Sequence, residues 1–371
     1  MRIAYLSTIF SQKAVSGASI HVNQFIDNVV SLGHDVFTPP TDEHPQTKKL
    51  PKTRWGRFLI LRQINILYYR IESILPPSSR WFQFPYYELI GRPVVVWEFN
   101  TVPEFGKMVG FRDEDIKQTK LKFIKYGKVC DLAICVSNAL SDYVKNTLKI
   151  KNVKTISNAS DPDLFHPDVK PTDKIKKNPD TLNVVWVGSA NLSWHNFYLL
   201  KETALYLYSI ANNNKYSMLF HVIGPGFRDN WDMPPNVLYH GPVEYKKLPE
   251  WLAAMDVGLC LYKPGPADYS SPLKVFDYMS SGLTVVGTSQ PQMEELFLQL
   301  DQKDLLVPPD DPKALARVLL MLSKNCAFLK KQGEAGRCLV LERYNWEKNA
   351  QDTMTAINKV LTLKRKYSEK P

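Results

Sequence analysis

Long apolar runs are missing from this chain of 371 residues. Charged or polar residues interrupt every apolar stretch well before the roughly 18 residues that a membrane-spanning helix needs. The first residues, Met1–Ser7, are typical of a short buried strand, and no apolar signal-peptide core or small-residue cleavage site follows them. We therefore expect neither a membrane span nor a secretory signal.

Cysteine is scarce, and none of the five residues forms a C-x-x-C pair or a cluster with histidine at metal-ligand spacing. Cys130, Cys135 and Cys260 lie in or beside apolar, strand-like runs, as reduced and buried thiols do. This pattern favours a cytoplasmic protein, and we expect no metal ion and no other cofactor.

Glycine is absent from Ser7–Gln12, the segment at the end of the first predicted strand. Dinucleotide-binding oxidoreductases need a glycine-rich turn there, because their backbone must approach the pyrophosphate closely. The sequence therefore argues against a nicotinamide-dependent oxidoreductase.

Acidic residues are absent between Glu43 and Glu72, and the whole chain has a net charge of +10. The stretch Lys48–Arg62 holds six cations interleaved with apolar side chains such as Trp55 and Phe58. We expect this stretch to contact an anionic membrane surface, with the protein peripheral at the inner face of the membrane. A solvated basic loop is the alternative, and we expect no nucleic-acid partner.

Strand-like and helix-like segments alternate along the chain, which predicts parallel sheets with helices on both faces. Because the chain is too long for one ordinary core, we predict two doubly wound, Rossmann-like domains at 1–165 and 181–343. A proline-rich linker is expected at 166–180, and a last helix with a charged tail at 344–371. The predicted strands are Arg2–Ser7, Asn65–Tyr69, Pro93–Trp97, Asp131–Val136, Val153–Ile156, Asn183–Val187, Met218–Ile223, Val237–His240, Val257–Tyr262 and Thr284–Gly287.

The segment Tyr269–Gly282 has the features of a ligand-binding helix. Ser271 is a favourable N-cap and Pro272 suits the first helical position, while Gly282 closes the helix. A helix N-terminus after a parallel strand presents free N–H groups to a diphosphate, and Lys274 adds a positive charge there.

The run Ser271–Gly282, with Thr284–Gly287 and Glu294–Glu295, resembles the donor-binding signature of glycosyltransferase family 4, whose members are retaining enzymes. The resemblance implies a GT-B fold, in which two Rossmann-like domains face a central cleft. It extends over nearly the whole chain through elements that match in order and spacing: Gly17–Val22, Leu32–Val36, Cys135–Ser137, Ser157–Asp161 with Phe165 and Pro167, Val187–Gly188, Ile223–Gly224, His240–Val243 and Tyr344–Trp346.

The same resemblance assigns the donor contacts. Asp277 would face the ribose, the alternative being an exposed helical carboxylate. Gly17 and Ala18 would let the first-domain backbone approach the donor phosphates, unless they form an ordinary turn between strand and helix. The start of the helix would hold the donor diphosphate through Ser271, Pro272, Leu273 and Lys274.

Polar residues of the first domain resemble those that family members direct into the cleft. Glu98, expected after a strand end, would contact the acceptor hydroxyl or act as a base, and His21 would contact the sugar. Arg70 and Asn100 would lie on the acceptor side. A structural salt bridge from Arg70 to a neighbouring acid, and a structural His21, are the alternatives.

Two positions depart from the family pattern. Family members carry an arginine and a lysine soon after the Val-Gly turn, but Val187–Asn196 holds neither. We expect Gly188, Ser189 and His195 to contribute to the phosphate site, with His195 or Lys274 partly replacing the missing charge.

The second departure is at the donor sugar. Where the family has a glutamate, this chain has Tyr269 with Asp268 beside it, and we expect the sugar contact from this pair.

These features predict a metal-independent, retaining glycosyltransferase that moves a sugar from a nucleotide-sugar donor to an acceptor hydroxyl, in polysaccharide or glycolipid biosynthesis. Without a metal, helix N-termini and fixed cations must stabilise the leaving diphosphate. The resemblance implies that this diphosphate helps to deprotonate the acceptor, which we expect to be lipid-linked. A catalytically impaired GT-B protein that binds or scaffolds is the alternative.

Overall fold

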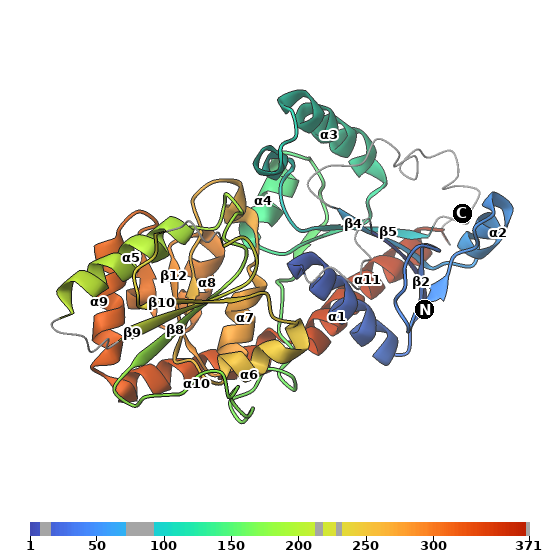
Figure 1. The fold of residues 1–371 in the computed structure, drawn as a ribbon. Helices are drawn as coiled ribbons and strands as arrows, with labels where there is room; N and C mark the ends of the chain where they lie inside the picture. Colours follow the sequence, from blue (N-terminus) through green and yellow to red (C-terminus); the bar gives the residue numbers. More distant parts are fainter. Residues whose placement is uncertain (8–15, 72–92, 212–217, 228–231, 369–371) are drawn as a thin grey trace. The chain divides into compact units, whose positions relative to one another are not determined.

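A computed structural model of the chain describes residues 1–7, 16–71, 93–211, 218–227 and 232–368. The glycine-free segment discussed above lies outside them from Thr8 onward. Two compact units make up the structure, shown as a ribbon in Figure 1. Unit 1 comprises Met1–Asn158, Tyr269–Ser271 and Trp346–Pro371, and unit 2 comprises Ala159–Asp268 and Pro272–Asn345.

The boundaries differ in detail from those expected. Unit 1 ends its first segment at Asn158 rather than at residue 165, and the proline-rich stretch 166–180 belongs to unit 2. There the Thr172 N–H donates to the Glu250 carbonyl over 2.9 Å, which ties the stretch to the second unit.

Unit 1 is built on a seven-stranded parallel sheet of order β3-β2-β1-β4-β5-β6-β7. Its strands are β1 (Arg2–Leu6), β2 (Asp35–Thr38), β3 (Lys48–Lys49), β4 (Ile66–Ile71), β5 (Val94–Phe99), β6 (Leu132–Cys135) and β7 (Val153–Thr155). Its helices are α1 (Gly17–Ser31), α2 (Arg54–Leu61), α3 (Asp113–Tyr126), α4 (Asn138–Asn146) and α11 (Trp346–Ser368), with 3₁₀ turns η2 (Pro103–Val109) and η3 (Gly127–Val129).

Alternate residues of these strands enter two hydrophobic clusters, because successive side chains of a strand point to opposite faces. In β1, Ile3 and Tyr5 join one cluster and Ala4 joins the other. Helices α1 and α11 cover the first face, while α3 and α4 cover the second. The last helix of the chain therefore completes the core of unit 1.

Unit 2 contains a six-stranded parallel sheet of order β10-β9-β8-β11-β12-β13 around one hydrophobic cluster. Its strands are β8 (Leu182–Val187), β9 (Met218–Ile223), β10 (Val237–Gly241), β11 (Val257–Cys260), β12 (Thr284–Thr288) and β13 (Leu306–Val307). Its helices are α5 (Phe197–Ile210), α6 (Leu248–Leu252), α7 (Leu273–Ser280), α8 (Pro291–Gln299), α9 (Pro312–Ser323) and α10 (Cys326–Arg343), with 3₁₀ turns η4 (Tyr245–Lys247), η5 (Pro266–Tyr269) and η6 (Lys303–Leu305).

None of the helices in the described ranges is long and apolar enough to cross a membrane. All five cysteines are free thiols; Cys135 and Cys260 are buried, and Cys130 is half-buried. Burial raises the pKa of Cys135 and of Cys260 to about 12, so both thiols are protonated at neutral pH.

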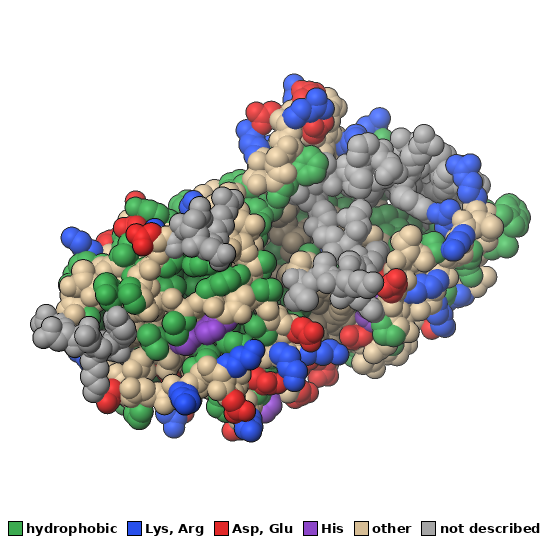
Figure 2. All heavy atoms as spheres, in the orientation of Figure 1, with side chains coloured by type: hydrophobic (Ala, Val, Ile, Leu, Met, Phe, Trp, Pro, Cys, Tyr) green, Lys and Arg blue, Asp and Glu red, His purple; other side chains and the backbone are tan. Residues whose placement is uncertain are grey.

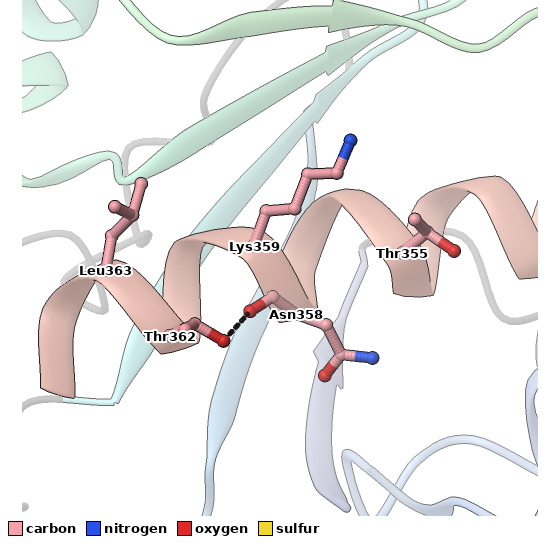
Figure 3. A pocket seen from close by; sticks show the side chains of 5 residues that line it. All are labelled: Thr355, Asn358, Lys359, Thr362 and Leu363. Atoms are coloured by element: carbon pink, nitrogen blue, oxygen red, sulfur yellow. Dashed lines mark hydrogen bonds between the residues drawn. The ribbon is translucent and has the colours of Figure 1, made fainter. Parts of the chain in front are cut away.

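An open depression of about 530 Å³ runs along α11 (Figure 3). Its lining residues all belong to that helix, and none is a predicted site residue. They are Thr355, Asn358, Lys359, Thr362 and Leu363.

Candidate functional site

A buried ammonium group marks the candidate site of unit 2. Lys274 lies in the first turn of α7, and its Nζ is 5.1 Å from the ring centre of Trp186 and 5.2 Å from that of Tyr262. Among the described residues this nitrogen has no hydrogen-bond partner, and burial lowers its pKa to about 8. Because an unpaired buried cation is costly, the position favours a bound anion.

Two glycines pack closely beside this ammonium. Gly188 follows β8, and a Cβ there would lie 3.0 Å from both the Lys274 Nζ and the His195 Cε1. Gly224 follows β9 with φ +137°, and a Cβ there would lie 1.9 Å from the Gly188 carbonyl oxygen. Neither position accepts a side chain without rearrangement, so glycine lets these two turns pack against each other and against Lys274 and His195.

Of the two residues expected to replace the missing cation, the geometry favours Lys274 over His195. The His195 Nδ1 donates to the Ser189 carbonyl over 2.8 Å, which leaves Nε2 as an acceptor. Burial, together with the charge of Lys274, lowers the His195 pKa to about 3. The imidazole is therefore neutral at physiological pH, and Lys274 carries the positive charge of this site.

The start of α7 is one residue later than predicted. Pro272 is the N-cap, with ψ 115°, and no described side chain caps the first turn. Ser271 was expected to be the N-cap, but it belongs to unit 1, where the Asn158 N–H donates to its hydroxyl over 3.3 Å. Without a side-chain cap, the N–H groups of Leu273 and Lys274 are left for a ligand.

Asp277 is buried in the middle of α7, so an exposed helical carboxylate is wrong for this position. Its Oδ1 accepts from the Ser160 hydroxyl at 2.7 Å and from the Tyr245 hydroxyl at 3.2 Å. Burial raises the pKa of Asp277 to about 7, although both hydrogen bonds oppose the shift. The side chain faces the interior of unit 2, and its contact with a ribose stays a prediction.

The two residues expected at the donor sugar belong to different units. Asp268 Oδ2 accepts from the Gly265 N–H at 2.8 Å and closes a tight turn in unit 2. In unit 1 the Tyr269 carbonyl accepts from the Ser137 hydroxyl at 2.8 Å. The Tyr269 ring packs edge-on against the Tyr143 ring, with 5.5 Å between the ring centres. The structure therefore gives each residue a local structural partner.

One polar residue near this edge of the sheet was missed by the sequence analysis. Gln290 follows β12 and is 4% exposed, and neither its side-chain oxygen nor its nitrogen has a partner among the described residues. A buried amide without partners is rare in proteins. Its position just after a predicted strand end was the available signal.

Unit 1 contains a buried ionic network around Glu98. The strands β4 and β5 extend further than predicted, so Arg70 and Glu98 lie within them rather than after them. Glu98 Oε1 accepts from Arg70 and lies 2.6 Å from the His21 Nε2, and the Tyr68 hydroxyl also bonds to this carboxylate. The salt bridge that we weighed as the alternative for Arg70 is thus present.

Neighbouring positive charges keep the Glu98 carboxylate ionised. Burial opposes ionisation of Glu98, but the charges of His21 and Arg70 outweigh it and lower the Glu98 pKa to about 2. The Asn158 amide donates to the Ser271 carbonyl over 2.6 Å, so its oxygen faces the His21 Nδ1 at 2.6 Å. Both nitrogens of His21 therefore face oxygen atoms, Nδ1 that of Asn158 and Nε2 that of Glu98.

The remaining predicted residues of unit 1 lie at the start of α1 and just after β5. Gly17 and Ala18 form the first turn of α1, which Ser16 caps through its side chain and the Ser19 N–H. Asn100 directly follows β5 and is half-buried. Their donor and acceptor contacts stay predictions.

Comparisons with known proteins agree with this arrangement. Residues 204–355 match a family model described as "Glycosyl transferase-like". The chain is 25% identical over 270 residues to the "Putative teichuronic acid biosynthesis glycosyltransferase TuaH" of Bacillus subtilis (strain 168), which covers 66% of this chain and 65% of that protein. The match thus spans slightly less than two thirds of the relative's length.

Solved structures resemble the whole chain. Sucrose-phosphate synthase from Thermosynechococcus elongatus superposes with a TM-score of 0.70 at 16% identity, over 98% of this chain and 100% of that one. Anabaena Alr3699/HepE in complex with UDP-glucose gives a TM-score of 0.65 at 13% identity, over 98% and 99%. The fold is GT-B. This confirms the predicted class of two Rossmann-like domains, whereas family 4 and retention stay predictions.

Proposed function

We propose that this protein is a glycosyltransferase that moves a sugar from a nucleotide-sugar donor to an acceptor hydroxyl during polysaccharide or glycolipid synthesis. The family model, the similarity to the teichuronic acid relative and the GT-B fold support the activity and its setting. Neighbours solved with UDP and UDP-glucose support a nucleotide-sugar donor. The buried free thiols fit our proposal of a cytoplasmic site of action.

The observation that carries the proposal is the unpaired ammonium of Lys274. A donor diphosphate would supply its missing counter-charge and would accept from the uncapped N–H groups of Leu273 and Lys274. Gly188 lies beside the same ammonium, where any side chain would meet the Lys274 Nζ. These groups are already in place, so they stabilise the charge that develops on the leaving diphosphate without reorganisation.

We infer that transfer proceeds with retention and needs no metal. The acceptor oxygen bonds to the anomeric carbon as the bond from that carbon to the diphosphate breaks, and the acceptor proton passes to the departing diphosphate. Glu98 is a poor proton acceptor with a pKa of about 2. We therefore assign Glu98 and His21 to positioning the first unit's strand ends and not to proton transfer.

Titration of UDP into the full-length protein tests the donor site. Lys274→Met should weaken UDP binding by about 10- to 100-fold, which corresponds to losing a charge-assisted contact of about 1.5–3 kcal/mol. The same variant without ligand should melt at a higher temperature than wild type, because an unpaired buried charge is gone. UDP affinity of the wild type should also fall as pH rises through about 8 and the ammonium deprotonates.

The exposed Lys313 of α9 provides the matched control. Lys313→Met should change neither UDP affinity nor melting temperature. Equal UDP affinity in wild type and Lys274→Met would remove Lys274 from the donor site.

A binding or scaffold protein without catalysis is the second candidate, favoured by the neutral His195 and by the missing cations of Val187–Asn196. Release of UDP from UDP-sugars, followed over long incubations, separates the two. Tight UDP binding with no hydrolysis or transfer would favour the scaffold.

A further inference from the structure

Helix α2 presents a surface that the fold of unit 1 does not use. No residue of the helix is buried, and Trp55 and Leu59 are 70% and 44% exposed. These two residues are four positions apart and so share one face of the helix, with Phe58 between them stacked on Trp55 at 5.6 Å. An exposed tryptophan beside exposed leucine is unusual for a surface that meets only water.

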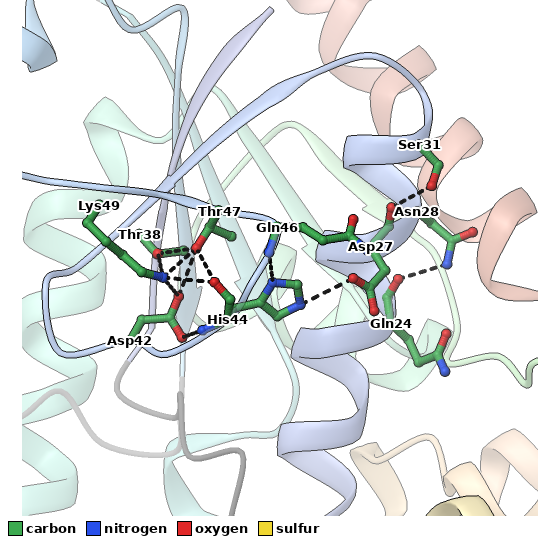
Figure 4. Close-up of polar contacts among 10 residues, drawn as sticks. All are labelled: Gln24, Asp27, Asn28, Ser31, Thr38, Asp42, His44, Gln46, Thr47 and Lys49. Carbon is green, nitrogen blue, oxygen red and sulfur yellow. Dashed lines mark hydrogen bonds and ion pairs between the residues drawn. The ribbon is translucent and has the colours of Figure 1, made fainter.

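Cations surround this apolar face, and not all six cations of the basic stretch are available. Lys48 pairs with Asp35 at 2.5 Å. The Lys49 Nζ is held by oxygens of Thr38, Asp42, His44 and Thr47 at 2.6–3.2 Å (Figure 4). These two lysines of β3 therefore bind residues of unit 1 itself, and we do not assign them to a partner.

Three cations next to the apolar face remain exposed: Lys52, Arg54 and Arg62. Within the described ranges no acid pairs with any of them, and the helix itself contains no acid. Figure 2 shows the apolar and cationic side chains gathered over α2. Apolar side chains flanked by cations are complementary to a bilayer interface that carries anionic headgroups.

We propose that α2 is an interfacial anchor, which inserts Trp55 and Leu59 among the acyl chains of an anionic membrane and places Lys52, Arg54 and Arg62 at the lipid phosphates. The occupant is a lipid bilayer and not a soluble polyanion, because a polyanion would use the cations and leave the apolar face in water. The inference does not depend on sugar transfer.

Vesicle flotation of the full-length protein tests the anchor without donor or acceptor. The protein should float with vesicles of phosphatidylcholine and phosphatidylglycerol, remain unbound with phosphatidylcholine alone, and dissociate at high salt. Replacing Lys52, Arg54 and Arg62 by Gln should weaken partitioning by about 100-fold, or about fivefold for each cation. Trp55→Ala should weaken it by about tenfold.

Matched variants in unit 2 control for net charge and for aromatic content. Gln at Lys313, Lys324 and Lys331 removes the same charge from exposed positions, and Tyr198→Ala removes a 66% exposed aromatic ring. Both should float like wild type. The proposal is overturned if wild type stays unbound at low salt, if the unit 2 variants lose binding equally, or if Trp55→Ala binds like wild type. Nucleotide affinity, measured separately, reports on the proposed function alone.

Discussion

Lys274 and Asp277 lie one turn apart on α7, and burial displaces the pKa of each in opposite directions. The ammonium falls to about 8 and the carboxyl rises to about 7, because a low-dielectric environment disfavours the charged form of both. The carboxyl nevertheless has two hydrogen-bond donors, whereas the ammonium has no acceptor among the described residues. Of the two, Lys274 is the residue that lacks a partner for its charge.

Asp277→Asn should remove a pH dependence of stability. Between about pH 4 and pH 7 the unfolded chain ionises this carboxyl while the folded chain keeps its proton, so folding stability falls as pH rises through that window, by on the order of 4 kcal/mol. Asparagine keeps an oxygen in the Oδ1 position for Ser160 and Tyr245 but cannot ionise. The variant should match wild type at pH 4.5 and melt higher at pH 8.

Melting curves at the two pH values check this, with Glu334→Gln as a control that removes an exposed carboxylate. A variant that is equally destabilised at both values would show that Asp277 is needed as a carboxylate.

Among the elements, β4, β5 and α1 together carry the buried network of Arg70, Glu98 and His21. Glu98 and Arg70 occupy the sheet face covered by α1, and the His21 ring packs edge-on 5.0 Å from that of Trp346. Both Arg70 and His21 contact the Glu98 carboxylate, so these side chains hold the three elements to one another.

Glu98→Gln should therefore destabilise the protein by about 3–5 kcal/mol, because it leaves the buried Arg70 without its counter-charge. Chemical denaturation measures the loss, and Glu114→Gln on the exposed first turn of α3 is the control. A variant with wild-type stability but sharply reduced turnover would instead restore Glu98 as a catalytic residue.

The sequence predicted most strands of both sheets, and Met218–Ile223 agrees at both ends with β9, whereas the two-residue edge strands β3 and β13 were not predicted. A strand such as β9 appears in the sequence as a short apolar run between helical segments. Because that pattern is local, hydrophobic periodicity predicts it. The contacts of His21 were beyond such analysis, because its partner Asn158 is 137 positions away in the sequence. The same holds for Asp277, whose burial depends on Ser160 and Tyr245 from other segments.

On the scale of the whole molecule, unit 1 draws on both ends of the chain. Ala350, Met354 and Ile357 of α11 are buried in the cluster that also holds Ile3 and Tyr5 of β1. The unit is therefore discontinuous in sequence, whereas most of unit 2 is one segment.

Met354→Ala should cost about 2–5 kcal/mol by leaving a cavity in this cluster, whereas Leu363→Ala on the same helix, 54% exposed, should cost little. Urea denaturation of both variants tests the contrast. Similar stabilities would mean that α11 contributes little to the core of unit 1.

The place of α11 also sets an order of events on the ribosome. A nascent chain emerges from its N-terminus, and domains ordinarily fold in that order. Here α1 alone can cover the sheet face of unit 1 formed by Ile3, Tyr5 and their neighbours until residues 350–357 have been synthesised, after all of unit 2 has emerged. Unit 2 can thus complete its core before unit 1 does.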